Sequence, residues 1–182
     1  MTTDGRCIGH LGCAMHRPVT IPALSSWPAL VATARGALWR SPDGAIERLK
    51  AGDVALRAAG TSPLVCHMPA VAARLGLEDI PARDLLELFA FVRPARFCLP
   101  TVRGLCEALD LAIPATPEEE VSALPQVARG LLEELDDMAA LASPEMKDTA
   151  LAMARGNWPW GEAVLAALGI DQGTKKPRPD AG

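Results

Sequence analysis

The pattern of apolar and polar residues is typical of extended strands in the first third of this chain and of helices beyond it. Residues 28–40 are largely apolar and predict extended backbone, and residues 41–44 (Ser-Pro-Asp-Gly) predict a turn. The segment 45–50 fits a strand that returns along the first. The pattern therefore predicts a hairpin or meander over residues 29–50.

Shorter elements follow this meander. Asp53 is a candidate N-cap for a short helix over 54–59, and the apolar run 63–66 predicts a short buried strand. Residues 69–75 predict a helix that stops at Gly76, because glycine readily adopts the left-handed conformation of a helix C-cap. Strands alternating with helices in this way predict an α/β domain with a small mixed sheet.

The second half of the chain predicts packed helices. The segment Ala82–Val92 carries apolar residues at the spacing i, i+3, i+4 and i+7, and Pro94 ends it. Thr101 is a candidate cap for the next helix. The inward side chains that we expect from these two helices are Leu85, Leu88, Phe89 and Val92, then Val102, Leu105 and Leu109.

Two further helix starts combine a hydroxyl residue, a proline and an acid, at 116–119 and at 143–145. We expect the first of these helices to reach about residue 142 with a break near Pro125, and the second to end near Arg155. A last short helix is expected over 161–168. The helical C-terminal half therefore follows from local signals.

Composition fits one domain with a real core. The 182 residues are 49% hydrophobic, contain no tyrosine and carry a net charge of −4. This balance gives no sign of a whole basic face for nucleic acid, and no apolar run is long enough to predict a membrane contact. We expect a flexible N-terminal tail (1–20), one domain (21–168) and a linker or disordered tail (169–182).

Cysteine usage and the N-terminus predict a reduced, cytoplasmic protein. The five cysteines lack paired spacing, and the first residues lack the basic start and apolar stretch of a secretion signal. Four residues with zinc-ligand side chains recur every three positions, although such crowding disfavours a tetrahedral site and Met15 is an alternative start of the chain. These metal candidates are Cys7, His10, Cys13 and His16.

Three segments in a fixed order, LVCHMPAVAARLG (64–76), RDLLELFAFVRP (83–94) and LPTVRGLCEALDLAIP (99–114), resemble metal-dependent exonucleases of the DEDD type. Together with RGNWPW (155–160), they are most similar to the N-terminal region of alphaproteobacterial DinG-type ATP-dependent DNA helicases. In that family a degenerate exonuclease-like domain precedes a helicase motor with an iron–sulfur cluster. The resemblance covers about residues 21–168 and implies an RNase H-like exonuclease scaffold in degenerate form.

The same resemblance implies that nuclease chemistry is lost. A two-metal site needs converging carboxylates. Alanine stands at the three positions where the family has metal-binding acids, Ala32, Ala34 and Ala72. Asp84 and Glu87 remain on one helical turn, where we expect a solvated face or a helix-end charge. For His67 we expect a hydrogen-bonded structural role, because no acid or nucleophile stands beside it in the sequence.

The sequence contains neither a phosphate-binding Walker loop nor a dinucleotide motif. We therefore expect no cofactor for this chain, because ATP, magnesium and the iron–sulfur cluster would belong to the helicase motor, which is absent from it. The family is enzymatic, but the chain by itself carries no enzyme signature, so its status as an enzyme stays open.

Five residues are candidate contacts to nucleic acid or to a partner. Arg93, Arg96 and Arg103 flank a proline-containing loop and form either a modest basic spot or ordinary surface charges. Trp158 and Trp160 either stack on exposed bases or bury against the helices, and the lack of a basic cluster beside them favours burial.

We expect a non-catalytic accessory or docking module of a DinG-type helicase in DNA repair or replication. Its partner would be the helicase motor, in cis or in trans, and DNA would be reached through the helicase. The alternative is a free-standing interaction protein derived from the same scaffold. An active metal-dependent nuclease with unusual ligands is the least favoured hypothesis.

Overall fold

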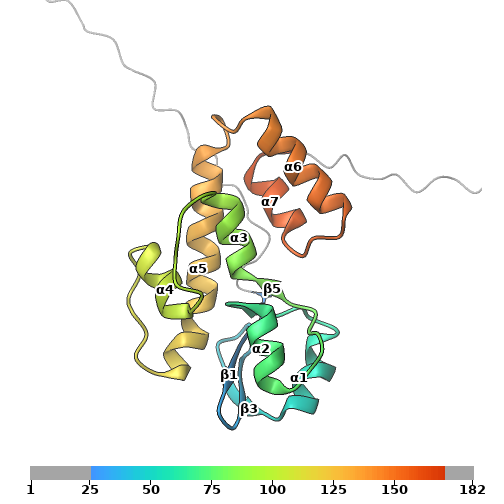
Figure 1. The fold of residues 1–182 in the computed structure, drawn as a ribbon, viewed down its shortest axis with the longest axis vertical. Helices are drawn as coiled ribbons and strands as arrows, with labels where there is room; N and C mark the ends of the chain where they lie inside the picture. The colour runs from blue at the N-terminus through green and yellow to red at the C-terminus, as the bar shows by residue number, and fades with distance from the viewer. Residues whose placement is uncertain (1–25, 171–182) are drawn as a thin grey trace, which may run out of the picture.

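A computed structural model describes residues 26–170, in which five strands form one mixed sheet with seven helices around it (Figure 1). The strand order is β3-β2-β1-β4-β5. Strand β1 (Ala29–Thr33) pairs antiparallel with β2 (Gly36–Arg40), which pairs antiparallel with β3 (Ile46–Leu49). The predicted meander and the mixed α/β class are confirmed.

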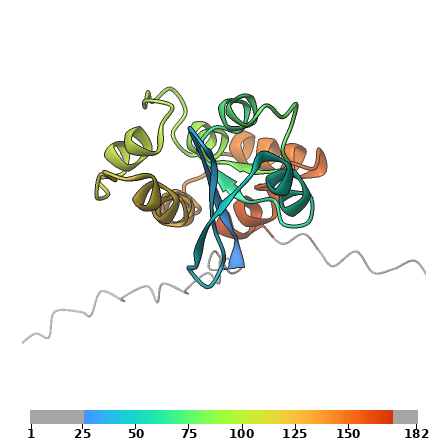
Figure 2. The ribbon, with the colours of Figure 1, turned by 90° about the horizontal axis from the view of Figure 1, so that it is seen from below.

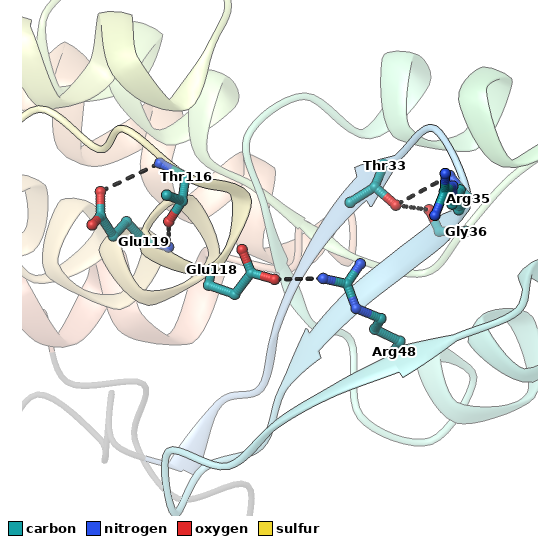
Figure 3. Close-up of polar contacts among 7 residues, drawn as sticks. All are labelled: Thr33, Arg35, Gly36, Arg48, Thr116, Glu118 and Glu119. Carbon is teal, nitrogen blue, oxygen red and sulfur yellow. Dashed lines mark hydrogen bonds and ion pairs between the residues drawn. The ribbon is translucent and has the colours of Figure 1, made fainter.

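A tight turn divides the segment 28–40, which the apolar pattern presents as one extended stretch. The Thr33 hydroxyl donates to the Gly36 carbonyl oxygen at 3.2 Å and accepts from the Arg35 amide at 3.4 Å (Figure 3). Gly36 has a φ of +123°, and a Cβ there would lie 2.4 Å from the carbonyl oxygen of Leu49. Only glycine fits this position, because a side chain would collide with the backbone of the neighbouring strand.

Two short parallel strands extend the meander. Strand β4 (Leu64–Val65) pairs with β1, and β5 (Arg83–Asp84) pairs with β4. Two helices connect these strands: α1 (Ala51–Ala58) precedes β4, and α2 (Met68–Leu75) separates β4 from β5. The carboxyl ends of β1, β4 and β5 therefore lie at one edge of the sheet.

The caps of α1 and α2 test the predicted boundaries. Helix α2 ends at Gly76 with a φ of +69°, as the sequence predicts. The prediction for α1 is wrong in one respect: Lys50 occupies the N-cap position, and Asp53 lies inside the first turn without capping it. An acid in the first turn still stabilises the helix through its dipole.

Helix α3 (Leu85–Val92) and helix α4 (Val102–Ala108) bury the predicted faces, although Leu109 is only half-buried. Helix α3 begins three residues later than the sequence predicts, at Leu85, since Arg83 and Asp84 pair with β4 instead. Local periodicity does not reveal such a pairing, because the partner strand lies almost twenty residues away.

Helix α5 (Pro117–Met138) begins with a capping box in which Thr116 and Glu119 bond to each other's backbone amides (Figure 3). The exposed Arg48 and Glu118 join β3 to this first turn at 2.7 Å. The predicted break near Pro125 is wrong, because α5 is continuous through it. Buried neighbours on one face of α5 offset the backbone hydrogen bond that proline cannot donate.

The last two described helices form a helical hairpin. Helix α6 (Pro144–Arg155) is capped by the Ser143 hydroxyl, and helix α7 (Gly161–Ala167) follows it, as the sequence predicts. Ile170 packs on the core beyond α7. None of the helices in residues 26–170 combines the length and apolarity needed to cross a membrane.

The sheet carries an apolar core on each face, and Figure 2 shows it nearly edge-on between helices. Ala29 and Val31 of β1 face the larger core, which α3 to α7 complete. Leu30 and Ala32 face the smaller core, which contains residues of α1 and α2. This alternation follows from the two-residue period of a strand and makes β1 common to both cores.

Candidate functional site

Two segments that carry the exonuclease resemblance, 64–76 and 83–94, meet β1 at the carboxyl edge of the parallel strands. Ala32 lies near the end of β1, His67 follows β4, and Asp84 ends β5. In open α/β sheets this edge is where ligand-binding groups gather. It is therefore the first place to look for a functional site.

Asp84 is the most buried charged residue of residues 26–170, at 5% exposure. Its carboxylate accepts from the Leu86 amide at 2.8 Å, which caps α3, and from the Met68 amide at 2.7 Å in the first turn of α2. One carboxylate thus closes two helix N-termini. Of the two alternatives expected for Asp84, the helix-end charge is the one observed and the solvated face is not, because Asp84 pairs with β4 as part of β5.

Glu87, one turn further along α3, behaves as the sequence predicts. It is exposed, and its carboxylate accepts from the Trp158 indole at 3.0 Å. The two carboxylates therefore serve different partners. In residues 26–170, no three His, Cys, Asp or Glu side chains are grouped so that they could hold a metal ion.

A recess of about 210 Å³ opens beside the carboxyl edge, between α2 and the starts of α4 and α5. His67 lines it, half-buried, and its imidazole makes no hydrogen bond to another residue of the described range. The sequence suggested a hydrogen-bonded histidine, so this placement is a correction. Four further side chains with reactive or polar groups line the recess: Cys66, Arg74, Thr101 and Glu120.

Two of the three alanines at predicted ligand positions are buried near this recess, and Ala32 lines it. Ala32 and Ala72 are 6% and 2% exposed and belong to the smaller core. The guanidinium of Arg74 donates to the Ala32 carbonyl oxygen at 3.5 Å. A cation therefore stands where a two-metal centre would need negative charge. The third alanine, Ala34, is exposed in the β1–β2 turn.

The thiols near the recess are poor nucleophiles. Burial raises the pKa of Cys66 to about 12, and the nearby charge of Asp84 adds to the shift. Burial likewise raises the pKa of Cys98 and of Cys106. Because the thiolate is the reactive form, these protonated thiols do not supply a nucleophile at neutral pH. The recess thus offers groups for binding rather than an activated nucleophile.

The two tryptophans have different environments. Trp160 is fully buried, donates from its indole to the Asp84 carbonyl oxygen at 2.7 Å, and meets Trp27 edge to face with ring centroids 5.6 Å apart. Trp158 is half-buried and tilted against Phe91 at 5.4 Å. Trp160 therefore joins α7 to β5, and its ring cannot reach a base without unfolding.

The three candidate arginines do not form one basic spot. Arg93 pairs with both carboxylate oxygens of Glu134 at 2.9 and 3.0 Å, so its charge is neutralised. Arg103 donates to the Pro114 carbonyl oxygen at 2.9 Å. Arg96 is exposed, and its guanidinium makes no hydrogen bond or ion pair with any residue from 26 to 170. Only Arg96 and Arg103 keep their charge available.

Sequence reasoning missed Phe97, which is 85% exposed beside Arg96. The available signal was its position in a proline-bounded segment outside any helical face. The metal candidates Cys7, His10, Cys13 and His16 lie outside the described residues.

Comparisons with protein-family models, with curated proteins and with solved structures find no match to this chain.

Proposed function

We propose that this domain is a catalytically silent, exonuclease-like module that docks onto a DinG-type ATP-dependent DNA helicase in DNA repair or replication. The observation that carries the proposal is the composition of the carboxyl edge. Buried alanines occupy positions where the resemblance requires metal-binding acids, and a guanidinium binds the backbone at the same place. A domain that keeps the exonuclease-like fold but lacks the metal-binding carboxylates is suited to binding rather than hydrolysis.

The arrangement of the sheet and helices supports the RNase H-like part of this proposal. Strands β4 and β5 extend the meander as a parallel pair, so the resembling segments 64–76 and 83–94 meet at one edge. The third segment, 99–114, reaches the recess beside this edge through Thr101. Helices α3 and α4 pack in the same core as Leu64 and Cys66 of the β4 region. The exonuclease interpretation requires this shared core beside that strand.

A nuclease assay tests the catalytic half of the proposal. The purified chain should leave single-stranded DNA intact with magnesium or manganese, because no three potential ligand side chains among residues 26–170 are grouped so that they could hold a metal ion. Metal-dependent digestion that survives rigorous purification, and disappears in Asp84→Asn, would contradict it. Asp84→Asn is preferred to alanine here because asparagine retains one cap-accepting oxygen.

Coexpression with a helicase motor tests the docking half. An affinity-tagged DinG-type motor from the same genome should retain this chain through gel filtration, in a ratio that is constant across the peak. A motor with a shuffled surface charge pattern is a suitable control. Elution of the two proteins as separate peaks at micromolar concentration would count against docking.

A further inference from the structure

The loop 93–101, which joins α3 to α4, exposes apolar side chains next to available cations. Phe97 and Leu99 are 85% and 54% exposed. Arg96, next to Phe97, has no side-chain partner in the described range. Arg103, in the first turn of α4, bonds only to a backbone carbonyl oxygen. In Figure 1 the loop leaves the upper end of α3 and descends to α4. Large exposed apolar groups on a protein surface often mark a binding site.

Anchors at both ends hold the loop in this conformation. At the start, the ion pair of Arg93 with Glu134 fixes the chain as it leaves α3. At the other end, a Cβ on Gly104 would lie 2.4 Å from the Leu99 carbonyl oxygen, so the loop lies directly on α4. Between the two exposed side chains, Cys98 is half-buried and packs on the larger core. The exposure of Phe97 is therefore built into the fold.

We propose that this loop is a contact site for single-stranded DNA, in which the Phe97 ring stacks on a base while Arg96 and Arg103 bind flanking phosphates. An exposed aromatic ring beside unneutralised arginines is the combination that single-strand binders use. The choice of DNA over RNA rests on the proposed helicase function, whereas the stacking and phosphate contacts rest on the loop itself.

Charge and space both favour this occupant. The stretch 93–103 contains three arginines and no acid, although the whole chain has a net charge of −4. Arg96 and Arg103 keep their charge, whereas Arg93 is paired with Glu134. A recess of about 580 Å³ lies beside Phe97 and Arg96, and the carboxylate in its wall, Glu134, is paired with Arg93. A base stacked on the ring can enter this recess, and the phosphate next to it then faces the free guanidinium group of Arg96.

Fluorescence anisotropy with a labelled 20-nucleotide oligo-dT tests the proposal on the full chain. Binding should weaken as salt increases, and Phe97→Ala should weaken it roughly 5- to 150-fold, the range that one lost stacking contact gives. Phe97→Leu should lose a similar factor, because leucine keeps the apolar surface but not the ring. Arg96→Ala should reduce the slope of log affinity against log salt by about 0.7.

Two matched variants control for general surface effects. Leu141→Ala removes an apolar side chain that is 89% exposed elsewhere, and Arg155→Ala removes an exposed arginine at the end of α6. Both should bind oligo-dT like the unmodified chain. Equal melting temperatures of all the variants exclude loss of fold as the cause of weaker binding.

Several outcomes would overturn the proposal. These are no salt-dependent binding of oligo-dT, unchanged affinity in Phe97→Leu, or equal losses in the control variants. Tighter binding of oligo-U would overturn the choice of DNA. If a labelled decapeptide of alternating aspartate and leucine bound this loop instead of oligo-dT, the surface would be a peptide-docking site. None of these results affects the helicase proposal, since that depends on association with the motor.

Discussion

At the residue scale, one buried carboxylate joins segments that are distant in the sequence. Asp84 accepts from the first turns of α2 and α3, and its own carbonyl oxygen accepts from the indole of Trp160. The side chain thereby fixes the carboxyl edge of the sheet, and the main chain fixes the hairpin of α6 and α7. Removing the carboxylate leaves two partly buried amide groups without an acceptor.

Asp84→Ala should therefore lower the free energy of unfolding by roughly 2–4 kcal/mol, since it removes two charge-assisted hydrogen bonds. Asp84→Asn should cost about half as much, because its amide oxygen still accepts one of them. Urea denaturation measures both, with exposed Asp148→Ala as the control that should stay within about 0.5 kcal/mol. A loss below 1 kcal/mol in Asp84→Ala would show that Asp84 is solvated.

The buried thiols predict an alkaline loss of stability. The folded pKa of Cys66 is raised to about 12, so between its ordinary value of 9.0 and that value the folded state binds more protons than the unfolded state. Stability should be fully present below pH 9 and fall as the pH rises toward 12. Urea midpoints between pH 8 and 11 should show a shallower fall in Cys66→Val. The chain has no tyrosine to obscure this comparison.

At the element scale, close approaches between helices decide which glycines are replaceable. A Cβ on Gly161, at the start of α7, would lie 2.7 Å from Cα and 2.8 Å from Cβ of Ala154 in α6. A Cβ on Gly130, inside α5, would meet no atom within 4 Å. The two glycines are alike in the sequence and differ only in what packs against them.

Gly161→Ala should destabilise the protein by about 1–3 kcal/mol, because α6 and α7 must move apart to accept the methyl group. Gly130→Ala should instead stabilise it by about 0.4–1 kcal/mol, since alanine loses less backbone entropy in a helix. Thermal melts of the two variants beside the parent measure the difference in sign. Equal effects of the two substitutions would contradict the close packing of α6 and α7.

At the scale of the whole molecule, β1 couples the two cores. Side chains of successive β1 residues point to opposite faces of the sheet, so β1 contributes to both cores. Loss of packing in one core therefore disturbs a strand on which the other core also depends. Strand β1 also lies in the middle of the sheet, between β2 and β4. The domain should therefore unfold in one cooperative transition.

Val54→Ala tests this coupling, because Val54 is fully buried in the smaller core on α1. The substitution should cost about 1–3 kcal/mol and shift the far-UV circular dichroism transition, which the helices of the larger core dominate. The tryptophan fluorescence transition should shift by the same amount. Two separated transitions would show that the cores unfold independently.

The sequence by itself determined the elements whose signals are local. The capping residues Thr116 and Ser143 start α5 and α6 as predicted, and Gly76 ends α2, because these contacts involve residues within four positions of each other. The buried faces of α3 and α4 follow from helical periodicity. The absence of a metal centre was not determined in this way and stays a hypothesis, which the alanine positions support.

Only the tertiary structure decided the rest. The pairing of β5 with β4, which shortens α3 and buries Asp84, joins segments separated by nearly twenty residues. The continuity of α5 through Pro125 depends on its buried face, and the exposure of Phe97 depends on anchors from α4 and α5. Local patterns report the preference of a segment, whereas burial and pairing depend on partners that are distant along the chain.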